Sequence, residues 1–224
     1  MELNTSFTVG EKRSYAKLLL YGRGGAGKTR FAGDAPNPYW YDSEDSTETL
    51  KNMGGEYAKI PFTVPTGPAE FLKHVRQVIK EERAETIVLD TVSTMLDKFM
   101  RKLLSAANAS KDQRQEYRTA TDIFTRLFGE LQEAPINVVI IGHRRIARDE
   151  VTGNITGIWP DVTPRLQDSI TRLVNVVAYL DIEPSGLKGA KRKLYLNPTP
   201  LIEAKNRLNI QEVFIQDPKW KDIF

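Results

Sequence analysis

The chain has 224 residues, of which 40% are hydrophobic and 27% charged, and this balance excludes collagen-like, low-complexity and wholly disordered chains. The absence of cysteine excludes disulfides, iron–sulfur clusters, thiolate zinc sites and a cysteine nucleophile, so metal chemistry must depend on carboxylates, hydroxyls and ligand phosphates. The formal net charge of +3 only mildly favours a polyanionic partner.

The polar start of the chain predicts no targeting segment and no membrane span, so we expect a cytoplasmic protein. No linker or repeat divides the sequence. We therefore expect a single domain over residues 1–224, with an N-terminal arm at 1–14 and a C-terminal tail at 210–224.

In the first half of the chain, short apolar runs alternate with a helical pattern, which is typical of a parallel sheet. Acidic residues follow two of the expected strands, Asp42 and Glu44 after one and Asp90 after another. The predicted elements are strands at 16–21, at 39–41 and near 58–62, a helix at 68–82, and a strand at 86–89.

The second half continues this alternation. The pattern over 92–133 predicts two helices with a connection near 106–114, and 136–141 predicts a buried strand that ends before His143. The following stretch, up to residue 163, is expected to be a long loop or a small hairpin, because it has glycines and little apolar periodicity. The remaining predictions are a helix at 165–174, a strand at 175–182, a hairpin into 191–196, and an irregular or short-stranded end.

The sequence GRGGAGKT at 22–29 fits two phosphate-binding patterns. One is the P-loop, G-x-x-x-x-G-K-T, and the other is the dinucleotide fingerprint G-x-G-x-x-G, for which Asp42 would be the ribose contact. Lys28 and Thr29 have a role only in the P-loop, where the lysine reaches the β and γ phosphates and the hydroxyl binds Mg²⁺. We therefore favour a P-loop over a dinucleotide site or a glycine-rich turn. The predicted ATP-binding residues are Gly22, Arg23, Gly24, Gly25, Ala26, Gly27, Lys28, Thr29 and Arg30.

Two carboxylates complete the predicted chemistry. Asp90 ends an apolar strand, which is where a P-loop protein places the acid that holds Mg²⁺ through water, and it can also cap the next helix. Glu44 is the candidate base for the attacking water. Asp42 and Asp45 are its rivals, and Glu44 as a solvated acid in a turn remains an alternative.

Several segments resemble the RecA core, and they occur in that family's order. These are WYDSE at 40–44, IVLDTVSTM at 87–95, IIGHRR at 140–145 and AKNRLNI at 204–210. The closest resemblance is to compact phage-encoded RecA-like ATPases of the Sak-type single-strand annealing group. The resemblance implies an α/β fold with a RecA-like P-loop core: a mostly parallel central sheet flanked by helices, with a C-terminal antiparallel hairpin.

The resemblance also implies roles for individual residues. Glu44 would be the hydrolytic base and His143 the γ-phosphate sensor, although a hydrogen-bonded core histidine is the alternative. Lys205 and Arg207 would reach a neighbouring subunit's nucleotide in a filament or ring. Two loops would face single-stranded DNA. Their candidate residues are Lys111 and Arg114 in the first and Arg144, Arg145, Arg148 and Trp159 in the second, with a solvated loop and a core tryptophan as the alternatives.

The function expected from these features is an ATP- and Mg²⁺-dependent ATPase that binds single-stranded DNA in recombination or annealing, with DNA stimulating hydrolysis. A homo-oligomer and a single-strand-binding protein are the expected partners. Three alternatives remain open: a phosphotransferase acting on a small metabolite, an annealing module in which the nucleotide is structural, and a dinucleotide-dependent oxidoreductase.

Overall fold

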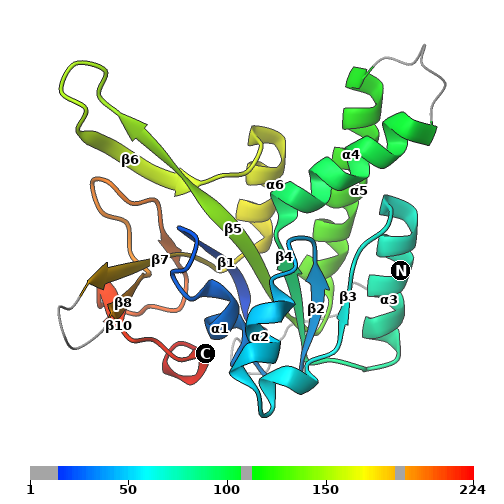
Figure 1. Ribbon diagram of the computed structural model, residues 1–224, viewed down its shortest axis with the longest axis horizontal. Helices are drawn as coiled ribbons and strands as arrows, with labels where there is room; N and C mark the ends of the chain where they lie inside the picture. The colour runs from blue at the N-terminus through cyan, green and yellow to red at the C-terminus, as the bar shows by residue number, and fades with distance from the viewer. Residues whose placement is uncertain (1–14, 107–112, 185–189) are drawn as a thin grey trace, which may run out of the picture.

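The computed structural model describes residues 15–106, 113–184 and 190–224. Within them a mixed sheet has the strand order β10-β8-β7-β1-β5-β4-β2-β3, and β6 and β9 pair with β5 and β7 (Figure 1). The five strands β7, β1, β5, β4 and β2 are parallel, as is the short edge strand β3. The strands are β1 Lys17–Gly22, β2 Pro38–Asp42, β3 Phe62–Thr63, β4 Thr86–Asp90, β5 Asn137–Arg148, β6 Ile155–Pro160, β7 Val176–Pro184, β8 Ala190–Tyr195, β9 Lys205–Asn206 and β10 Phe214–Gln216.

Helices cover both faces of this sheet, because the parallel strands are apolar on both sides. One face packs against α3, α4, α5 and α6, and the other against α1, α2 and the end of the described chain. The helices are α1 Lys28–Gly33, α2 Thr47–Met53, α3 Pro68–Lys80, α4 Val92–Ala106, α5 Gln113–Glu133 and α6 Pro164–Leu173, with short 3-10 turns at Tyr57–Lys59 and Trp220–Asp222. No helix in the described parts of the chain is long and apolar enough to cross a bilayer.

The strand order separates the two interpretations of the glycine loop. In the dinucleotide-binding fold the first two strands of the chain lie side by side. Here β1 lies between β5 and β7, and both β5 and β4 separate it from β2. The dinucleotide hypothesis is therefore wrong for this chain.

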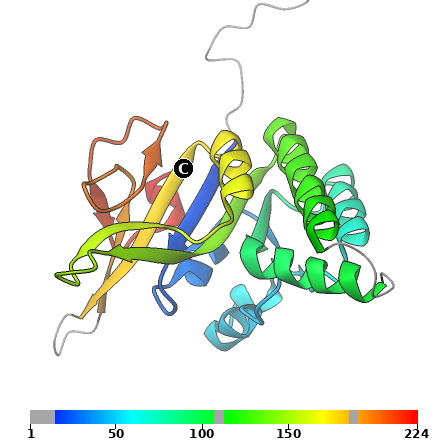
Figure 2. The same ribbon diagram turned by 90° about the horizontal axis from the view of Figure 1, so that it is seen from above.

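The predicted α/β fold is confirmed, with its mostly parallel sheet and the antiparallel pair β7–β8 at the C-terminal side. Two local predictions were wrong. The segment near 58–62 is mainly a 3-10 turn, with a strand only at Phe62–Thr63. The strand expected to end before His143 instead continues to Arg148, because β6 pairs with it in an antiparallel hairpin. That hairpin projects from the body, and Figure 2 shows it extending away from the green helices α4 and α5.

A buried lysine joins β1 to the end of α5. Lys17 is 6% exposed, and its ammonium donates to the carbonyl oxygens of Leu131, Ala134 and Ile136 at 2.7, 3.0 and 2.5 Å. Helix ends leave carbonyl oxygens without partners, so the lysine satisfies acceptors that would otherwise be buried alone. Burial lowers the pKa of Lys17 to about 8.

We expect Lys17 to make the free energy of unfolding depend on pH in the alkaline range. In the unfolded chain the pKa returns to its usual value near 10.5, so between about pH 8 and 10.5 the unfolded state binds more protons than the folded state. The free energy of unfolding of the wild type should therefore rise relative to that of Lys17→Met over this range. Urea unfolding of both proteins at pH 7.5 and 10 measures the difference, and equal changes in the two proteins would contradict the expectation.

Candidate nucleotide-binding site

The glycine loop leaves β1 and has a conformation that depends on glycine at three positions. A Cβ on Gly22 would lie 2.2 Å from the carbonyl oxygen of Leu180 in β7, too close for any side chain. Gly25 and Gly27 have φ values of 75° and 100°, in the left-handed region that favours glycine. The loop thus bends tightly over the end of β1, and Arg23, Gly24 and Gly25 are exposed.

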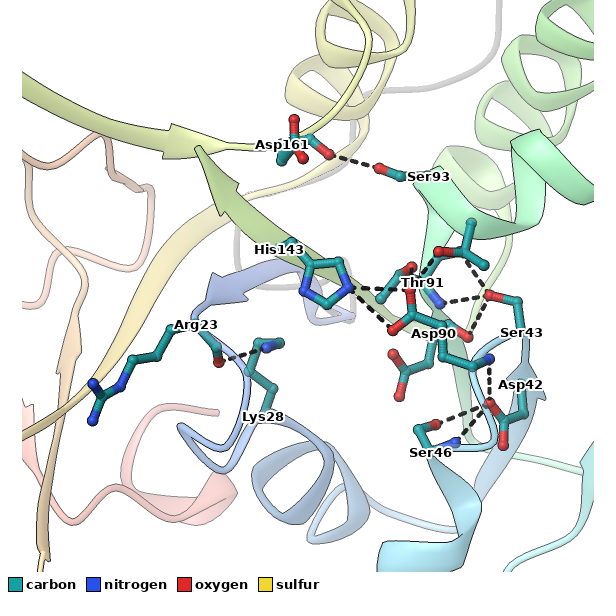
Figure 3. Close-up of polar contacts among 12 residues, drawn as sticks. Arg23, Lys28, Asp42, Ser43, Ser46, Asp90, Thr91, Ser93, His143 and Asp161 are labelled. Carbon is teal, nitrogen blue, oxygen red and sulfur yellow. Dashed lines mark hydrogen bonds and ion pairs between the residues drawn. The ribbon is translucent and has the colours of Figure 1, made fainter. Parts of the chain in front are cut away.

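Lys28 is the first residue of α1 and is 8% exposed. Its ammonium donates to the carbonyl oxygens of Gly22 and Arg23 at 3.1 and 3.0 Å, across the loop (Figure 3). Desolvation lowers its pKa, while the charges of Asp90 and Glu44 oppose that shift. Lys28 thus lies across the loop between its two ends, positioned for an anion held by the loop's N–H groups.

Two other predicted loop residues point elsewhere. The Arg23 guanidinium donates to the carbonyl oxygen of Ile182 in β7 and extends away from Lys28 (Figure 3). Arg30, which is exposed, lines a cavity whose walls also include Phe31, Asp34 and Trp220. Thr29 is partly buried beside Lys28.

Glu44 and His143 meet at the same edge of the sheet. Both oxygens of the Glu44 carboxylate lie 3.1 Å from His143 Nε2. The carboxylate also accepts hydrogen bonds from Thr91 Oγ1 at 2.8 Å and from Thr94 Oγ1. The hydrogen bond with His143, followed by those from the two threonines, lowers the pKa of Glu44 to about 2. The same contact raises the pKa of His143. The register places His143 opposite Gly22 on β1, so the pair faces the glycine loop.

Asp42 has a different role from Glu44. Its carboxylate accepts from the backbone N–H groups of Glu44, Ser46 and Thr47 and from both hydroxyls of Ser46 and Thr47, at 2.6 to 3.1 Å. These bonds shape the turn into α2 and lower the pKa of Asp42 despite its burial. The carboxylate is therefore fully occupied within the turn.

Ser43, the small residue between Asp42 and Glu44, joins two strands. Ser43 is 2% exposed, and its hydroxyl bonds to the Asp90 and Thr91 carbonyl oxygens and accepts from Thr91 N at 2.9 Å. It fixes the end of β2 against the end of β4, where Asp42 and Asp90 are register partners. Because Ser43 is buried between the two strand ends, the site favours a small side chain at this position.

Asp90 is 2% exposed, and its Oδ2 has no hydrogen-bond partner among the described residues. Burial raises its pKa to about 6. A buried acceptor without a partner fits a magnesium-bound water, which would donate to it. No group of three His, Asp or Glu side chains suited to a metal occurs in residues 15–106, 113–184 and 190–224, so such an ion would depend on Thr29 and on the nucleotide's own phosphates.

The two predicted intersubunit cations lie in different environments. Lys205 donates to the carbonyl oxygens of Thr171 and Val174 at 2.6 and 2.9 Å, at the end of α6, and burial lowers its pKa. Arg207 is exposed. Lys205 thus satisfies the end of α6 much as Lys17 satisfies the end of α5, and of the two only Arg207 extends into solvent.

The predicted DNA-facing residues of the second loop lie on the β5–β6 hairpin. Arg145 is exposed, is the register partner of half-buried Trp159, and shares a face with His143 two residues earlier. Arg144 alternates to the other face, where it donates to the Tyr179 hydroxyl at 2.7 Å. Arg148 is near the tip and donates to the Gly153 carbonyl oxygen at 2.9 Å. Of the first loop, Arg114 lies in the first turn of α5, and Lys111 lies outside the described residues.

Three residues at this site lie outside the set predicted from the sequence. Thr91 and Thr94 hold Glu44, and the helical spacing of an early α4 turn could have indicated that they face the same edge. Arg192 of β8 reaches the loop and donates to the Ala26 carbonyl oxygen at 3.2 Å. No local signal pointed to Arg192, because the contact depends on how β8 pairs with β7.

Comparisons with known proteins show the family and the fold of the chain. A family model described as AAA domain matches residues 14–208. A KaiC-like protein from the hyperthermophilic archaeon Pyrococcus horikoshii has a similar structure, with a TM-score of 0.53 and 16% identity over 89% of this chain and 82% of that one. At that identity the likeness concerns the fold. No curated protein matches the chain.

Proposed function

The chain belongs to the AAA-domain family and has a RecA-like P-loop fold, and we propose that it binds and hydrolyses ATP with Mg²⁺, binds single-stranded DNA, and acts in phage-type recombination or annealing. The observation that carries the proposal is the position of Glu44, an ionised carboxylate that lies with His143 and Asp90 at the edge of the sheet where the glycine loop begins. DNA binding and recombination rest on the resemblance to the Sak-type group and on the hairpin described above.

The geometry suggests how hydrolysis would proceed. Lys28 would leave the two loop carbonyls for the β and γ phosphates, while a bound Mg²⁺ would neutralise phosphate charge. A carboxylate with a pKa near 2 accepts a proton poorly, so Glu44 becomes an effective base only when its contact with His143 is reduced. His143 would turn from Glu44 to the γ-phosphate, and Glu44 would then orient the attacking water.

ATP turnover with and without single-stranded DNA tests this function. We expect phosphate release that needs Mg²⁺, needs no small-molecule acceptor and rises when an oligonucleotide is added. Turnover that requires a metabolite acceptor would support a phosphotransferase instead. Negligible turnover with tight ATP binding would support a structural nucleotide.

The β5–β6 hairpin supports the proposed DNA contact. Arg145 and Trp159 face each other across its two strands, so one exposed surface offers a cation for phosphate and an aromatic ring for a base. A Cβ on Gly157 would lie 2.3 Å from the Trp159 indole, so the ring lies flat against the hairpin at that glycine. Arg144 points the other way and is no part of this surface.

We expect Arg145→Ala and Trp159→Ala each to weaken binding of a single-stranded oligonucleotide by about tenfold, because a base–aromatic stack contributes about 1–3 kcal/mol. Fluorescence anisotropy across a salt series measures this effect, and Arg145→Ala should also lower the log–log salt slope by about 0.7. Arg172→Ala removes an exposed arginine on α6 and is the matched control. Equal affinities for all variants would contradict the hairpin surface.

The proposed oligomer places the nucleotide between subunits, with Arg207 as the cation that reaches the neighbour. Each interface would take Glu44 from one subunit and Arg207 from its neighbour. Arg207→Ala and Glu44→Gln should therefore each lower ATP turnover. Mixing Arg207→Ala with Glu44→Gln should restore activity, because some interfaces then combine an intact Glu44 with an intact Arg207.

For random mixing of equal amounts, about a quarter of the interfaces are complete, so about a quarter of wild-type turnover should return. The measurement is phosphate release from each variant alone and from the mixture at the same total concentration. Activity in the mixture that equals the average of the separate variants would remove Arg207 from an intersubunit role.

A further inference from the structure

A side-chain hydrogen bond joins the base of the β5–β6 hairpin to the first turn of α4. Ser93 Oγ donates to the Asp161 carbonyl oxygen at 2.6 Å (Figure 3). Ser93 is the second residue of α4, and Asp161 directly follows the last residue of β6. The two residues are 68 positions apart in the chain, so the contact comes from the tertiary fold and not from a local turn.

At its α4 end, this hydrogen bond lies within the turn that holds the candidate base. Thr91 comes just before α4 and Thr94 follows Ser93 directly, and the hydroxyls of both threonines donate to Glu44 Oε1. The same carboxylate oxygen lies 3.1 Å from His143 Nε2. A shift of this turn would therefore change how Glu44 is held against His143.

At its hairpin end, the hydrogen bond lies next to the surface proposed for single-stranded DNA. The backbone N–H of Asp161 donates to the His143 carbonyl oxygen at 2.9 Å, which closes the base of the hairpin. Arg145 follows His143 by two residues on β5, and Trp159 precedes Asp161 by two residues on β6. Each strand of the hairpin therefore connects the Arg145–Trp159 surface to the site over two residues.

Together these contacts form a closed ring. It passes from Glu44 to His143, from His143 to Asp161, from Asp161 to Ser93, and through Thr94 back to Glu44. The ring gives the hairpin two connections to Glu44. A displacement of β5 moves His143, whereas a displacement of β6 acts through Ser93 on the turn of α4.

The surroundings of Ser93 favour a role in positioning over a role in stability. Ser93 is partly exposed and Asp161 is exposed, and a hydrogen bond that water can replace contributes little to the free energy of unfolding. Burial of apolar side chains fixes the start of α4 on the sheet instead. These side chains are Val92, Met95, Leu96 and Phe99.

We propose that Ser93 is a positioning residue that couples the β5–β6 hairpin to Glu44 through the first turn of α4. Single-stranded DNA bound at Arg145 and Trp159 displaces β6, and the Ser93 hydroxyl passes that displacement to the turn that holds Glu44. The inference rests on the proposed function, in which Glu44 is the base and the hairpin binds DNA. It adds a connection through α4 to the one that His143 makes directly.

Three serine variants test the coupling. Ser93→Ala removes the hydroxyl, and Ser93→Thr keeps one. Ser105→Ala is the matched control, because it makes the same change near the other end of α4, where the hydroxyl donates to the Lys102 carbonyl oxygen of the same helix. ATP turnover of each full-length protein is measured with and without a saturating single-stranded oligonucleotide, and the ratio of the two rates is the stimulation factor.

We expect the stimulation factor to fall about fivefold in Ser93→Ala, which is the usual contribution of one hydrogen bond, and to keep its wild-type value in Ser93→Thr and Ser105→Ala. Equal stimulation factors in Ser93→Ala and the wild type would overturn the coupling. So would a loss of both rates at an unchanged ratio, which is the result of a merely structural role. A wild type that DNA does not stimulate would overturn the proposed function itself, and the coupling with it.

Hydrogen exchange without DNA gives a second readout, because coupling between two binding sites is reciprocal. A non-hydrolysable ATP analogue with Mg²⁺ should protect the glycine-loop peptide equally in the wild type and in Ser93→Ala. Exchange in peptides covering 157–163 should change on binding in the wild type, and less in Ser93→Ala. Equal changes at 157–163 in both proteins, or none in either while the loop is protected, would overturn the coupling. An unprotected loop would contradict nucleotide binding, and the inference would fall with it.

Discussion

Glu44→Gln should bind ATP and hydrolyse it about 10²–10⁴-fold more slowly than the wild type, which is the usual contribution of a general base. Glutamine keeps the size of the side chain and still accepts from Thr91 and Thr94, but it cannot take a proton from water. The effect should therefore appear in kcat, with the Kd for ATP nearly unchanged. Single-turnover phosphate release together with equilibrium ATP binding separates the two quantities.

Asp45→Asn is the matched control for this variant. It also converts an acid to its amide, one residue away, and Asn tolerates the φ of 56° that Asp45 adopts. Asp45 is exposed and should be dispensable for hydrolysis. Full activity in Glu44→Gln, or an equal loss in Asp45→Asn, would remove Glu44 from the role of base.

Lys28→Met should abolish measurable ATP turnover and weaken ATP binding by at least about 100-fold, since a charge-assisted hydrogen bond to phosphate contributes about 1.5–3 kcal/mol and the lysine reaches two phosphates. Methionine fills the same space without a charge, so the fold should persist. Isothermal titration with ATP measures binding, and circular dichroism checks the fold.

The comparison with Lys17→Met makes this result specific. Both lysines are buried, and both donate only to backbone carbonyl oxygens in the structure, but Lys17 lies at the opposite end of β1 from the glycine loop. Lys17→Met should change the pH dependence of stability and leave the affinity for ATP unchanged. Equal ATP affinities in Lys28→Met and the wild type would contradict the P-loop.

Much of the site could be predicted from the sequence because its chemistry is local. Eight consecutive residues form the glycine loop, and Asp90 follows an apolar strand whose carboxyl end must meet the same edge of the sheet. Parallel pairing alone brings Glu44, Asp90 and His143 to that edge. In the structure, hydrogen bonds within the turn occupy the Asp42 carboxylate. Only these bonds distinguish Asp42 from Glu44 as the candidate base.

The β5–β6 hairpin confirms one of the two expectations for this stretch, a small hairpin rather than a long loop. Other features could not be predicted because they depend on contacts between segments far apart in the chain. Lys205 has the sequence context of an exposed cation, yet the end of α6 lies near enough to take its hydrogen bonds. Arg192 is one of several cations near a turn, and only the alternation of β8 directs its side chain to the glycine loop.

The twelve-residue length of β5 has a mechanical consequence. The strand runs about 40 Å as a single stiff element, from the hydrophobic interior past His143 into the hairpin. The register shifts between Ala147 and Arg148, beyond Arg145. Arg145 and Trp159 therefore lie on the same side of this irregularity as His143, so a ligand bound at these two residues would contact the regular part of β5, whereas the Arg148–Gly153 tip lies beyond the shift.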